Sequence, residues 1–462
     1  MTQRAEIGEW VQRRLPELLA EGQVPGAAVA VLAGDEVVDA AAGVLSTATG
    51  VEATTDSVFQ VGSITKLWTT TLIMQLVDAG RLELDAPVRR YLPDFRTADS
   101  DAAAAVTVRH LLCHVAGFEG DIFTDTGRGE DAVEKYVATL AEVPQLFPPG
   151  AMFSYNNAGF CVLGRIVEVL RDAPYAQCLT DHLITPLGLT HTAPSPYEAI
   201  RYRAAVGHLQ HAPDAAPEPA PVWALTASNA PAGAMLAMRP RDLLGFAAMH
   251  LRGGTAPDGR RVLSPASVAA MRQRQVQLPE LGLMGDAWGL GWEIYDAPGG
   301  TVVGHDGGTI GQRAFLRVVP DRNVAVAVLT NGGNPMPLYT EIAGTVLREL
   351  AGVELPALPV PADEPPAVDA SRYLGTYASS VADQVVRQDA DGRIWLDRTP
   401  KGILADIGEQ PKTVELVGWR GDTLIGREPE QGLYLPHAFV GVDGDGRAAY
   451  LHTGRADPRV SS

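Results

Sequence analysis

The segment GSITKLW at residues 62–68 decides how the rest of this sequence is interpreted. Apolar residues recur at helical spacing over residues 64–76, and Gly80 is placed to end the predicted helix. Ser63 and Lys66 are nearly one helical turn apart, so their side chains point the same way. A buried amine of lowered pKa can take a serine proton, and N–H groups at a helix N-terminus favour an oxyanion. The pair is therefore a candidate nucleophile and base, although a capping serine beside a surface lysine gives the same pattern.

A second candidate segment, FSYNN at residues 153–157, precedes a predicted helix over 158–169. Tyr155 and Asn157 lie two residues apart on a predicted loop, so both side chains can face one cavity. A phenol near a lysine can relay protons, and an amide can orient the lysine and a substrate carbonyl. Taken alone, the pattern also fits a buried tyrosine followed by a helix-capping asparagine.

A third candidate segment, GHDGG at residues 304–308, ends a predicted strand. Glycines let the backbone approach a ligand closely, so the N–H of Gly308 can act as an oxyanion donor. His305 would present its imidazole to a substrate or to Tyr155. The alternative interpretation is a histidine in a glycine-rich turn.

The first part of the chain has strand patterns at both of its ends. Residues 26–32 and 37–42 predict two strands joined by a turn, and residues 301–304, 313–319 and 324–329 predict three more. Helical patterns lie between them, for example over 239–250. This order predicts one antiparallel sheet assembled from both ends of the domain, with helices packed on it.

A proline-rich segment, LPALPVPADEPPAVD at residues 355–369, divides the chain. Proline at this density cannot continue a helix or a central strand and gives an extended spacer. Residues 370–462 contain short apolar runs separated by turn signals, which predict a small all-β barrel or sandwich. The DGDG sequence at 443–446 lacks the ligand set of a calcium loop and predicts a hairpin turn. We therefore expect a first domain over 1–354, a linker over 355–369 and a β domain over 370–462.

The composition argues against several classes of partner. The 462 residues include 37 basic and 55 acidic side chains, a formal net charge of −18. Such a surface repels phosphate backbones and anionic lipids, so we expect neither a nucleic acid nor a membrane partner. No apolar run reaches the roughly 18 residues of a membrane-spanning helix. The first twenty residues have the spacing of an amphipathic helix rather than of a secretion signal, so we expect a cytoplasmic protein.

Cysteine and histidine patterns argue against a metal site. The three cysteines are scattered and form neither a disulfide framework nor a metal knuckle, so we expect three reduced thiols. His110 and His114 are four residues apart, but Leu111 stands where an H-E-x-x-H zinc motif needs glutamate, and a third ligand would also be required. We interpret both histidines as core residues or supports of the site, and we expect no metal and no cofactor.

Together, the S-x-x-K, Tyr-x-Asn and His-x-Gly segments resemble the motifs of the serine β-lactamase and penicillin-binding-protein superfamily. His-x-Gly at 305–307, in place of K-T-G, resembles the class C-like branch of esterases, D-aminopeptidases and cyclases. LLCHVAG at 111–117 resembles the family's L-L-x-H-x-S-G, with Cys113 and Ala116 departing from the usual residues. The resemblance covers about residues 20–350. It implies an α+β fold, with an antiparallel sheet flanked by helices plus a helical subdomain, and residues 370–462 resemble the family's lipocalin-like appendage.

Carried over motif by motif, the resemblance implies roles for five side chains. Ser63 would be the acylated nucleophile, Lys66 its base, and Tyr155 the group that shuttles the proton to the leaving group. Asn157 would orient the lysine and the acyl amide. His305 would take the place of the K-T-G lysine and either bind a carboxylate or tune the tyrosine.

The backbone N–H groups of Ser63 and Gly308 would then form the oxyanion hole of a serine acyl-enzyme hydrolase or acyltransferase acting on an ester, thioester or amide. Water as acceptor gives a hydrolase, whereas an amine or alcohol gives a transferase or cyclase. The layout also resembles stand-alone penicillin-binding-protein-type thioesterases that release and cyclise nonribosomal peptides. Its substrate would be a small-molecule or peptidyl acyl compound, including a thioester held by a carrier protein. An intracellular esterase, a D-amino-acid peptidase, a weak β-lactamase and a non-catalytic ligand-binding homologue are the alternatives.

Overall fold

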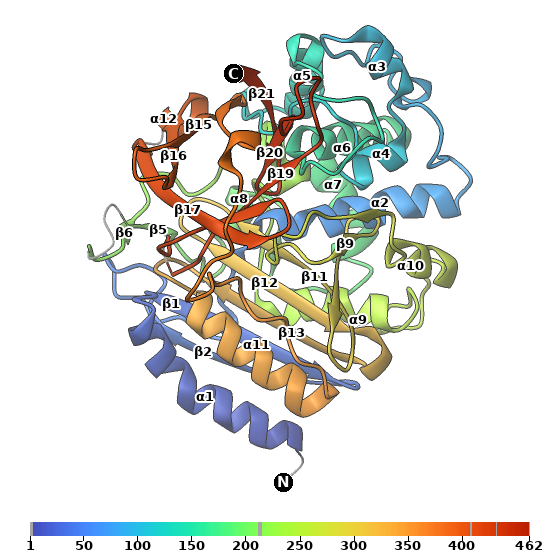
Figure 1. Ribbon diagram of the computed structural model, residues 1–462. Coiled ribbons are helices and arrows are strands. Elements are labelled where there is room, and N and C mark those ends of the chain that lie inside the picture. The colour runs from blue at the N-terminus through green and yellow to red at the C-terminus, as the bar shows by residue number, and fades with distance from the viewer. Residues whose placement is uncertain (1–2, 211–214, 407–408, 431, 462) are drawn as a thin grey trace.

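An eight-stranded antiparallel sheet, assembled from distant parts of the chain, forms the centre of the structure (Figure 1). The computed structural model describes residues 3–210, 215–406, 409–430 and 432–461. The strand order β2-β1-β13-β12-β11-β10-β9-β8 places the first hairpin beside the last strand of the sheet. The strands are β1 (Gly26–Ala33), β2 (Glu36–Gly43), β8 (Val276–Gln277), β9 (Ala287–Trp288), β10 (Glu293–Ala297), β11 (Gly300–Gly308), β12 (Arg313–Val319) and β13 (Val324–Thr330).

The central strand β13 is buried on both faces, which explains its uninterrupted apolar sequence. Val324, Val326 and Val328 contribute to a core with α1 (Gln3–Glu21) and α11 (Met336–Ala351), which lie side by side on one face (Figure 1). The alternate residues of the strand contribute to a second core, shared with α2 (Thr65–Asp78) and α9 (Pro240–Leu251). The sheet is thus a rigid layer between two sets of helices.

A helical region continues the second core away from the sheet. Its larger members are α2 and α6 (Asn157–Arg171), which contact each other. The others are α3 (Ser100–Ala105), α4 (Val108–Leu112), α5 (Ala132–Thr139), α7 (Tyr175–Leu179), α8 (Pro196–Ala199) and α10 (Pro265–Met271), with short strands β3 (Phe59–Gln60), β4 (Thr192–Ala193), β5 (His208–Leu209), β6 (Glu218–Pro219) and β7 (Ala237–Met238). The α+β class and the helical subdomain expected from the sequence are confirmed.

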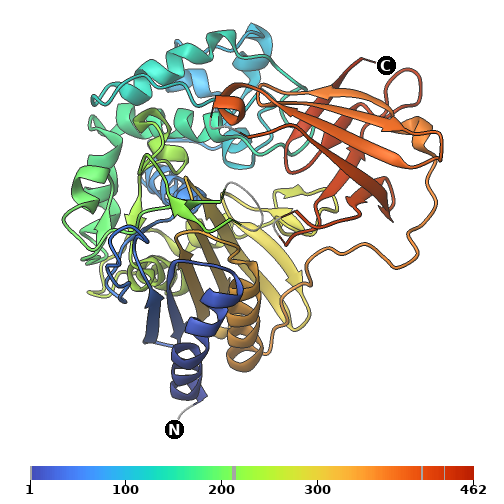
Figure 2. The same cartoon turned by 90° about the vertical axis from the view of Figure 1, so that its left-hand side faces the viewer.

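The last part of the chain forms a closed eight-stranded barrel, β14 to β21 in sequence order. Its strands are β14 (Gly375–Ala378), β15 (Ala382–Gln388), β16 (Ile394–Pro400), β17 (Lys412–Arg420), β18 (Thr423–Gly426), β19 (Pro436–Val440), β20 (Tyr450–His452) and β21 (Ala456–Ser461), with a short α12 (Gly402–Asp406). The proline-rich segment runs along the outside of the molecule to the barrel (Figure 2). The expected lipocalin-like β fold is confirmed, while the division of the chain at residues 354/355 and 369/370 stays a prediction.

Several local predictions have clear structural outcomes. The amphipathic helix at the N-terminus is α1, and the three cysteines are free and buried. The DGDG segment forms a turn in which Asp443 accepts backbone hydrogen bonds from Asp445 and Arg447. The sequence GHDGG does not leave the sheet, because β11 continues through Gly308. Within the described ranges, no helix is both long and apolar enough to cross a lipid bilayer.

Candidate active site

A tight turn, η1 (Gly62–Ile64), holds Ser63 against the end of β11. Gly62 has a φ of +52°, and a Cβ atom there would lie 2.5 Å from the backbone nitrogen of Gly308. Such a conformation and such a close approach both require glycine. The backbone at Ser63 therefore packs directly on the end of β11, which is the arrangement that two oxyanion-binding N–H groups need.

The Lys66 side chain is fully buried and held by three polar contacts. Its Nζ atom lies 3.1 Å from Ser63 Oγ, 2.7 Å from Asn157 Oδ1 and 2.6 Å from the carbonyl oxygen of Ala232. The amide and carbonyl oxygens can only accept hydrogen bonds, so they take two N–H groups of a neutral amine. The remaining lone pair then faces the serine hydroxyl. Burial lowers the pKa of Lys66 to about 7, which makes this neutral form accessible.

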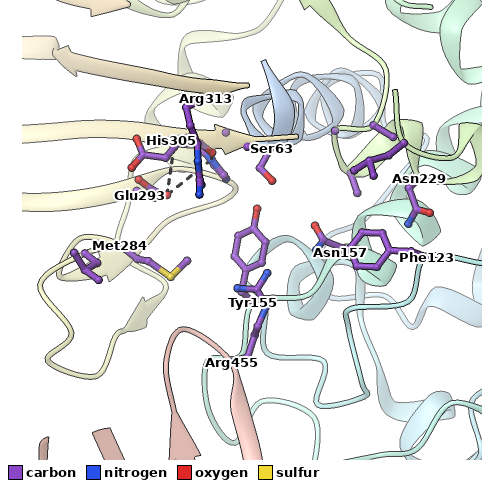
Figure 3. Close-up of a pocket in the computed structure, with 18 residues that line it drawn as sticks. Ser63, Phe123, Tyr155, Asn157, Asn229, Met284, Glu293, His305, Arg313 and Arg455 are labelled. Carbon is purple, nitrogen blue, oxygen red and sulfur yellow. Dashed lines mark hydrogen bonds and ion pairs between the residues drawn. The ribbon is translucent and has the colours of Figure 1, made fainter. Parts of the chain in front are cut away.

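Tyr155 fills the other side of the serine, and its hydroxyl points toward Ser63 (Figure 3). The ring centroid lies 4.8 Å from Lys66 Nζ, and the ring stacks on His114 at 4.3 Å. Burial raises the pKa of Tyr155, whereas the Ser63 hydrogen bond and the Arg455 charge oppose this rise. The phenol is therefore protonated at rest and available as a proton donor.

The amide of Asn157 is oriented by a charged pair that reaches to the barrel. Its Nδ2 atom donates to Asp121 Oδ1 at 2.7 Å, which turns Oδ1 of the amide toward Lys66. Arg455 Nε donates to the other Asp121 oxygen at 2.5 Å. A continuous chain of hydrogen bonds thus connects Arg455 to the amine of Lys66.

His305 is a neutral imidazole inside the wall of the cavity. Burial, assisted by the Lys66 charge, lowers the pKa of His305 to about 3. Its Nδ1 atom lies 2.6 Å from the carbonyl oxygen of Asp306, so the proton resides on Nδ1. Its buried Nε2 atom has no hydrogen-bond partner among the described residues. A neutral ring cannot supply the positive charge of the K-T-G lysine, so the structure favours a role near Tyr155, whose ring centroid is 6.3 Å away.

Two carboxyl groups lie beside His305, and each is already engaged. Burial raises the pKa of Glu293 to about 8, with a further rise caused by the nearby carboxylate of Asp306. Glu293 accepts a hydrogen bond from the Tyr295 hydroxyl at 2.6 Å. Asp306 forms an ion pair with the buried guanidinium of Arg317 at 2.6 Å.

These groups surround a cavity of about 340 Å³. Ser63 and Tyr155 lie at its middle, with Phe123 and Asn229 on one side and Met284 and Arg313 on the other (Figure 3). Of the residues predicted from the sequence, the cavity wall contains Ser63, Tyr155, Asn157, His305 and Gly308, while Lys66 lies directly behind Ser63. The structure therefore brings all six together.

The barrel supplies one edge of this cavity. The backbone N–H of Tyr155 donates to the Gly454 carbonyl oxygen at 2.9 Å, and the N–H of Ala456 donates to Ser154 Oγ at 3.1 Å. The guanidinium of Arg455 then lies 4.9 Å from the Tyr155 ring centroid. The hairpin between β20 and β21 thus holds the loop that carries the candidate proton donor.

Sequence reasoning missed Asp121, Glu293, Arg313 and Arg455. Each is an ordinary charged residue outside the three motifs, and no local pattern distinguishes it from surface charges. Arg455 in particular reaches the site only because the barrel closes and docks. Its position next to Gly454, a residue type common in turns, is the only local signal, and that signal is weak.

The histidines at 110 and 114 have structural partners. His110 forms a capping box with Thr107 at the start of α4. His114 accepts a hydrogen bond from the backbone N–H of Asn156 at 2.8 Å through Nδ1. Across residues 3–461, apart from the undescribed positions, no group of three His, Cys, Asp or Glu side chains is arranged to hold a metal ion.

The fold and this arrangement of serine, lysine and tyrosine define a serine enzyme of the β-lactamase type. A family model described as "Beta-lactamase" matches residues 11–350, and the chain belongs to this family. It is a serine hydrolase of the β-lactamase and penicillin-binding-protein superfamily. The recognition made from the three motifs is confirmed.

Three proteins of known sequence or structure are similar to this chain. Penicillin-binding protein 4 of Amycolatopsis lactamdurans is 46% identical over 368 residues, which cover 79% of this chain and 96% of the relative. The crystal structure of SurE is similar over 99% of this chain and 100% of its own, with 32% identity and a TM-score of 0.79. A D-stereospecific amidohydrolase from Streptomyces sp. shares 26% identity and a TM-score of 0.58, over 74% of this chain and 98% of its own.

The buried amine predicts the pH dependence of the reaction. Only uncharged Lys66 can accept the Ser63 proton, so kcat/KM for a neutral ester should rise with pH through about 7 and then level off. At pH 5 it should be about 100-fold below the plateau. Initial rates between pH 5 and 9 measure this, with circular dichroism as the control for folding. A profile that is flat from pH 5 to 8 contradicts the role given to Lys66.

The barrel hairpin predicts a shift of that profile. Arg455 lowers the pKa of Lys66 by charge repulsion, so Arg455→Met should move the acidic limb of kcat/KM to higher pH. The matched control is Arg393→Met, which removes an exposed arginine of the barrel that lies in a turn and outside the cavity wall. An acidic limb that stays in place in Arg455→Met, with the protein folded, would show that the hairpin does not influence the lysine.

Proposed function

We propose that the protein forms an acyl-enzyme on Ser63 and transfers the acyl group to water or to an amine. The observation that carries this proposal is the buried Lys66 amine, whose Nζ atom lies 3.1 Å from Ser63 Oγ. Lys66 takes the hydroxyl proton as Ser63 Oγ attacks the acyl carbonyl carbon. The backbone N–H groups of Ser63 and Gly308 bind the resulting oxyanion.

Collapse of the tetrahedral intermediate breaks the bond to the leaving group, which needs a proton. Tyr155 donates that proton, and the Lys66 ammonium then gives a proton to the phenolate, so that the proton taken from Ser63 replaces the one that Tyr155 gave to the leaving group. Asn157 holds the lysine in position through its Oδ1 atom, 2.7 Å from Nζ. The same groups act in reverse when water or an amine attacks the acyl-enzyme.

For the acyl donor, we propose a peptidyl or aminoacyl compound whose reacting residue has the D configuration. A solved structure of SurE contains D-Leu, and that SurE chain is 30% identical to the present protein in a match that covers 99% of the present chain. The similarity to a D-stereospecific amidohydrolase supports the same choice. One of these relatives was solved with a D-amino acid, and the other is D-stereospecific. We therefore favour a D-residue as the acyl donor of this protein.

For the acceptor, we propose the amino terminus of the same peptide, so that a thioester donor is released as a ring. The cavity extends to both sides of Ser63, which leaves room for an acyl chain and an incoming amine (Figure 3). The likeness to SurE includes the barrel, and in this chain the barrel supplies a wall of the cavity. A thioester presented by a carrier protein would supply such a substrate.

The nucleophile is tested by covalent labelling. A fluorophosphonate should modify the wild-type protein on Ser63 and leave Ser63→Ala unlabelled, while Lys66→Gln should be labelled about 100- to 10,000-fold more slowly. Ser100→Ala removes an exposed hydroxyl of α3 and should be labelled like wild type. Mass spectrometry of the digested adduct locates the label. Modification of Ser63→Ala at an equal rate on another residue refutes the mechanism.

The acyl donor and acceptor are tested with a substrate panel. Linear peptidyl thioesters that end in a D-residue should be consumed at least about ten times faster than their L-epimers and should yield a cyclic product. A p-nitrophenyl ester and nitrocefin in the same panel test the esterase and β-lactamase alternatives. Release of linear acid alone from the D-thioester contradicts the cyclase proposal, and turnover of none of the compounds favours a ligand-binding homologue.

A further inference from the structure

A second cavity lies at the end of α2 that is opposite to Ser63. Its volume is about 570 Å³, and its wall comes from the last turn of α2, the end of α6, the helical turn η4 (Thr180–Ile184) and residues 260–264, which lead into α10 (Figure 1). Because α2 has 14 residues, it is about 21 Å long, so the two cavities cannot share one small ligand. The charged and titratable residues of the wall are Asp78, Arg171, Asp181, His182, Arg260 and Arg261.

Arg171 is a partly buried guanidinium whose contacts are all with uncharged groups. Its Nη1 atom lies 2.9 Å from His182 Nε2, and its Nη2 atom donates to Gln75 Oε1 at 2.8 Å. A guanidinium can only donate hydrogen bonds, so Nε2 is the acceptor and the imidazole of His182 is neutral. The buried Nε atom of Arg171 has no hydrogen-bond partner among the described residues. Burial lowers the pKa of Arg171, and the nearby charge of Arg81 adds to this effect.

Arg261 brings a second guanidinium without a carboxylate to the same wall. It is exposed, and its Nη1 atom contacts the carbonyl oxygen of Gly253 at 3.4 Å. Gln75 joins this segment to Arg171, because its Nε2 atom donates to the carbonyl oxygen of Val262 at 3.0 Å while its Oε1 atom accepts from Arg171. Within the described ranges, no carboxylate forms an ion pair with either arginine.

The two carboxylates of the wall are held by other groups. Asp78 accepts hydrogen bonds from the backbone N–H of Ser264, the Ser264 hydroxyl and the Ser267 hydroxyl, all at 2.6 to 2.7 Å. These bonds direct both of its oxygens toward the start of α10. Asp181 Oδ1 accepts from Gln177 Nε2 at 2.7 Å. Neither carboxylate therefore balances the charge of Arg171 or Arg261.

The charge that remains unbalanced in this cavity is positive. Arg260, the third arginine of the wall, is paired with Asp258 at 2.6 Å, which leaves the charges of Arg171 and Arg261. A partly buried cation without a counter-ion is unfavourable, and an external anion removes that cost. A phosphomonoester carries nearly two negative charges at neutral pH and three acceptor oxygens, which match two guanidinium groups.

The size of the cavity indicates that such an anion has an organic part. An inorganic phosphate ion would fill only a small part of the 570 Å³. The wall also contains the apolar residues Pro186, Val262 and Leu263, beside the arginines. Cavities with an apolar wall and a few converging polar groups are typical of small-molecule sites.

We propose that this cavity binds a small phosphomonoester, with its phosphate between Arg171 and Arg261 and its organic part against Pro186 and Val262. Two of the five N–H groups of Arg171 are used by His182 and Gln75, so others remain for the phosphate oxygens. The site is separate from Ser63 and does not require the acyl-enzyme mechanism.

The proposal is tested by isothermal titration calorimetry on the full chain with three compounds. Phenyl phosphate should bind one site, with at least about tenfold higher affinity than inorganic phosphate, because only the ester also contacts the apolar wall. Phthalate, a dicarboxylate with a similar ring, should bind more weakly than phenyl phosphate. No saturable binding of phenyl phosphate up to about 10 mM overturns the proposal, and tighter binding of phthalate overturns the choice of a phosphate.

The two arginines are tested by substitution. Arg261→Gln should weaken the binding of phenyl phosphate about 10- to 100-fold, and Arg261→Lys should be intermediate because it keeps the charge without the planar fork. Arg171→Gln should weaken it to a similar extent, with thermal unfolding as the check that the chain remains folded. The matched control is Arg322→Gln, which removes an exposed arginine outside the cavity and should bind like wild type. An affinity of Arg261→Gln within twofold of wild type contradicts the site.

A last comparison separates this cavity from the active site, which also contains arginines. Protein modified on Ser63 by a fluorophosphonate should bind phenyl phosphate with unchanged affinity. Loss of binding after modification would place the phosphate in the active site and overturn the proposal. Failure of the fluorophosphonate to react would refute the acyl-enzyme mechanism, while the titrations of the unmodified arginine variants would still decide whether the second cavity binds.

Discussion

The site depends on the burial of one lysine side chain without a carboxylate in direct contact. Lys66 is 0% exposed, and its amine contacts a hydroxyl, an amide oxygen and a backbone carbonyl. An ammonium ion in this position would lose its water and gain no counter-ion, so the neutral amine is favoured. Asp121 reaches the lysine only through the amide of Asn157. This spacing matters, because a carboxylate next to the amine would hold the proton on it.

The fold satisfies this constraint by bringing four separate parts of the chain to one point. The sheet contains strands from both ends of the first part of the chain, and it fixes β11 together with the turn that carries Ser63. The helical region contributes α6, which begins at Asn157, and the loop before it carries Tyr155. The barrel then contacts that loop from outside through Gly454. Each part is rigid for its own packing reasons, so the geometry of the site does not depend on a flexible loop alone.

Local patterns marked Ser63, Lys66, Tyr155 and Asn157 as candidates, and the resemblance of the combined motifs to one family supplied their expected roles; the structure places the four side chains together. Local patterns also predicted the sheet and the barrel, whose strands have apolar runs bounded by turn residues. The protonation state of His305 could not be predicted from local patterns. Its imidazole is neutral because it is buried, and this burial arises only when the whole fold is assembled. Arg455 and Arg313 were missed for a similar reason: one depends on how two domains dock, and the other on the register between β11 and β12.

The hydrogen bond from the Tyr155 N–H to the Gly454 carbonyl oxygen limits how freely the C-terminal barrel can change in sequence. The C-terminal barrel contributes directly to the candidate site, because its hairpin contacts the backbone and the ring of Tyr155, the candidate proton donor. Recombination that replaced this module with an unrelated barrel would have to reproduce the length and register of one hairpin to within a residue. Substitutions in the hairpin between β20 and β21 are therefore expected to be matched by substitutions in the loop that carries Tyr155.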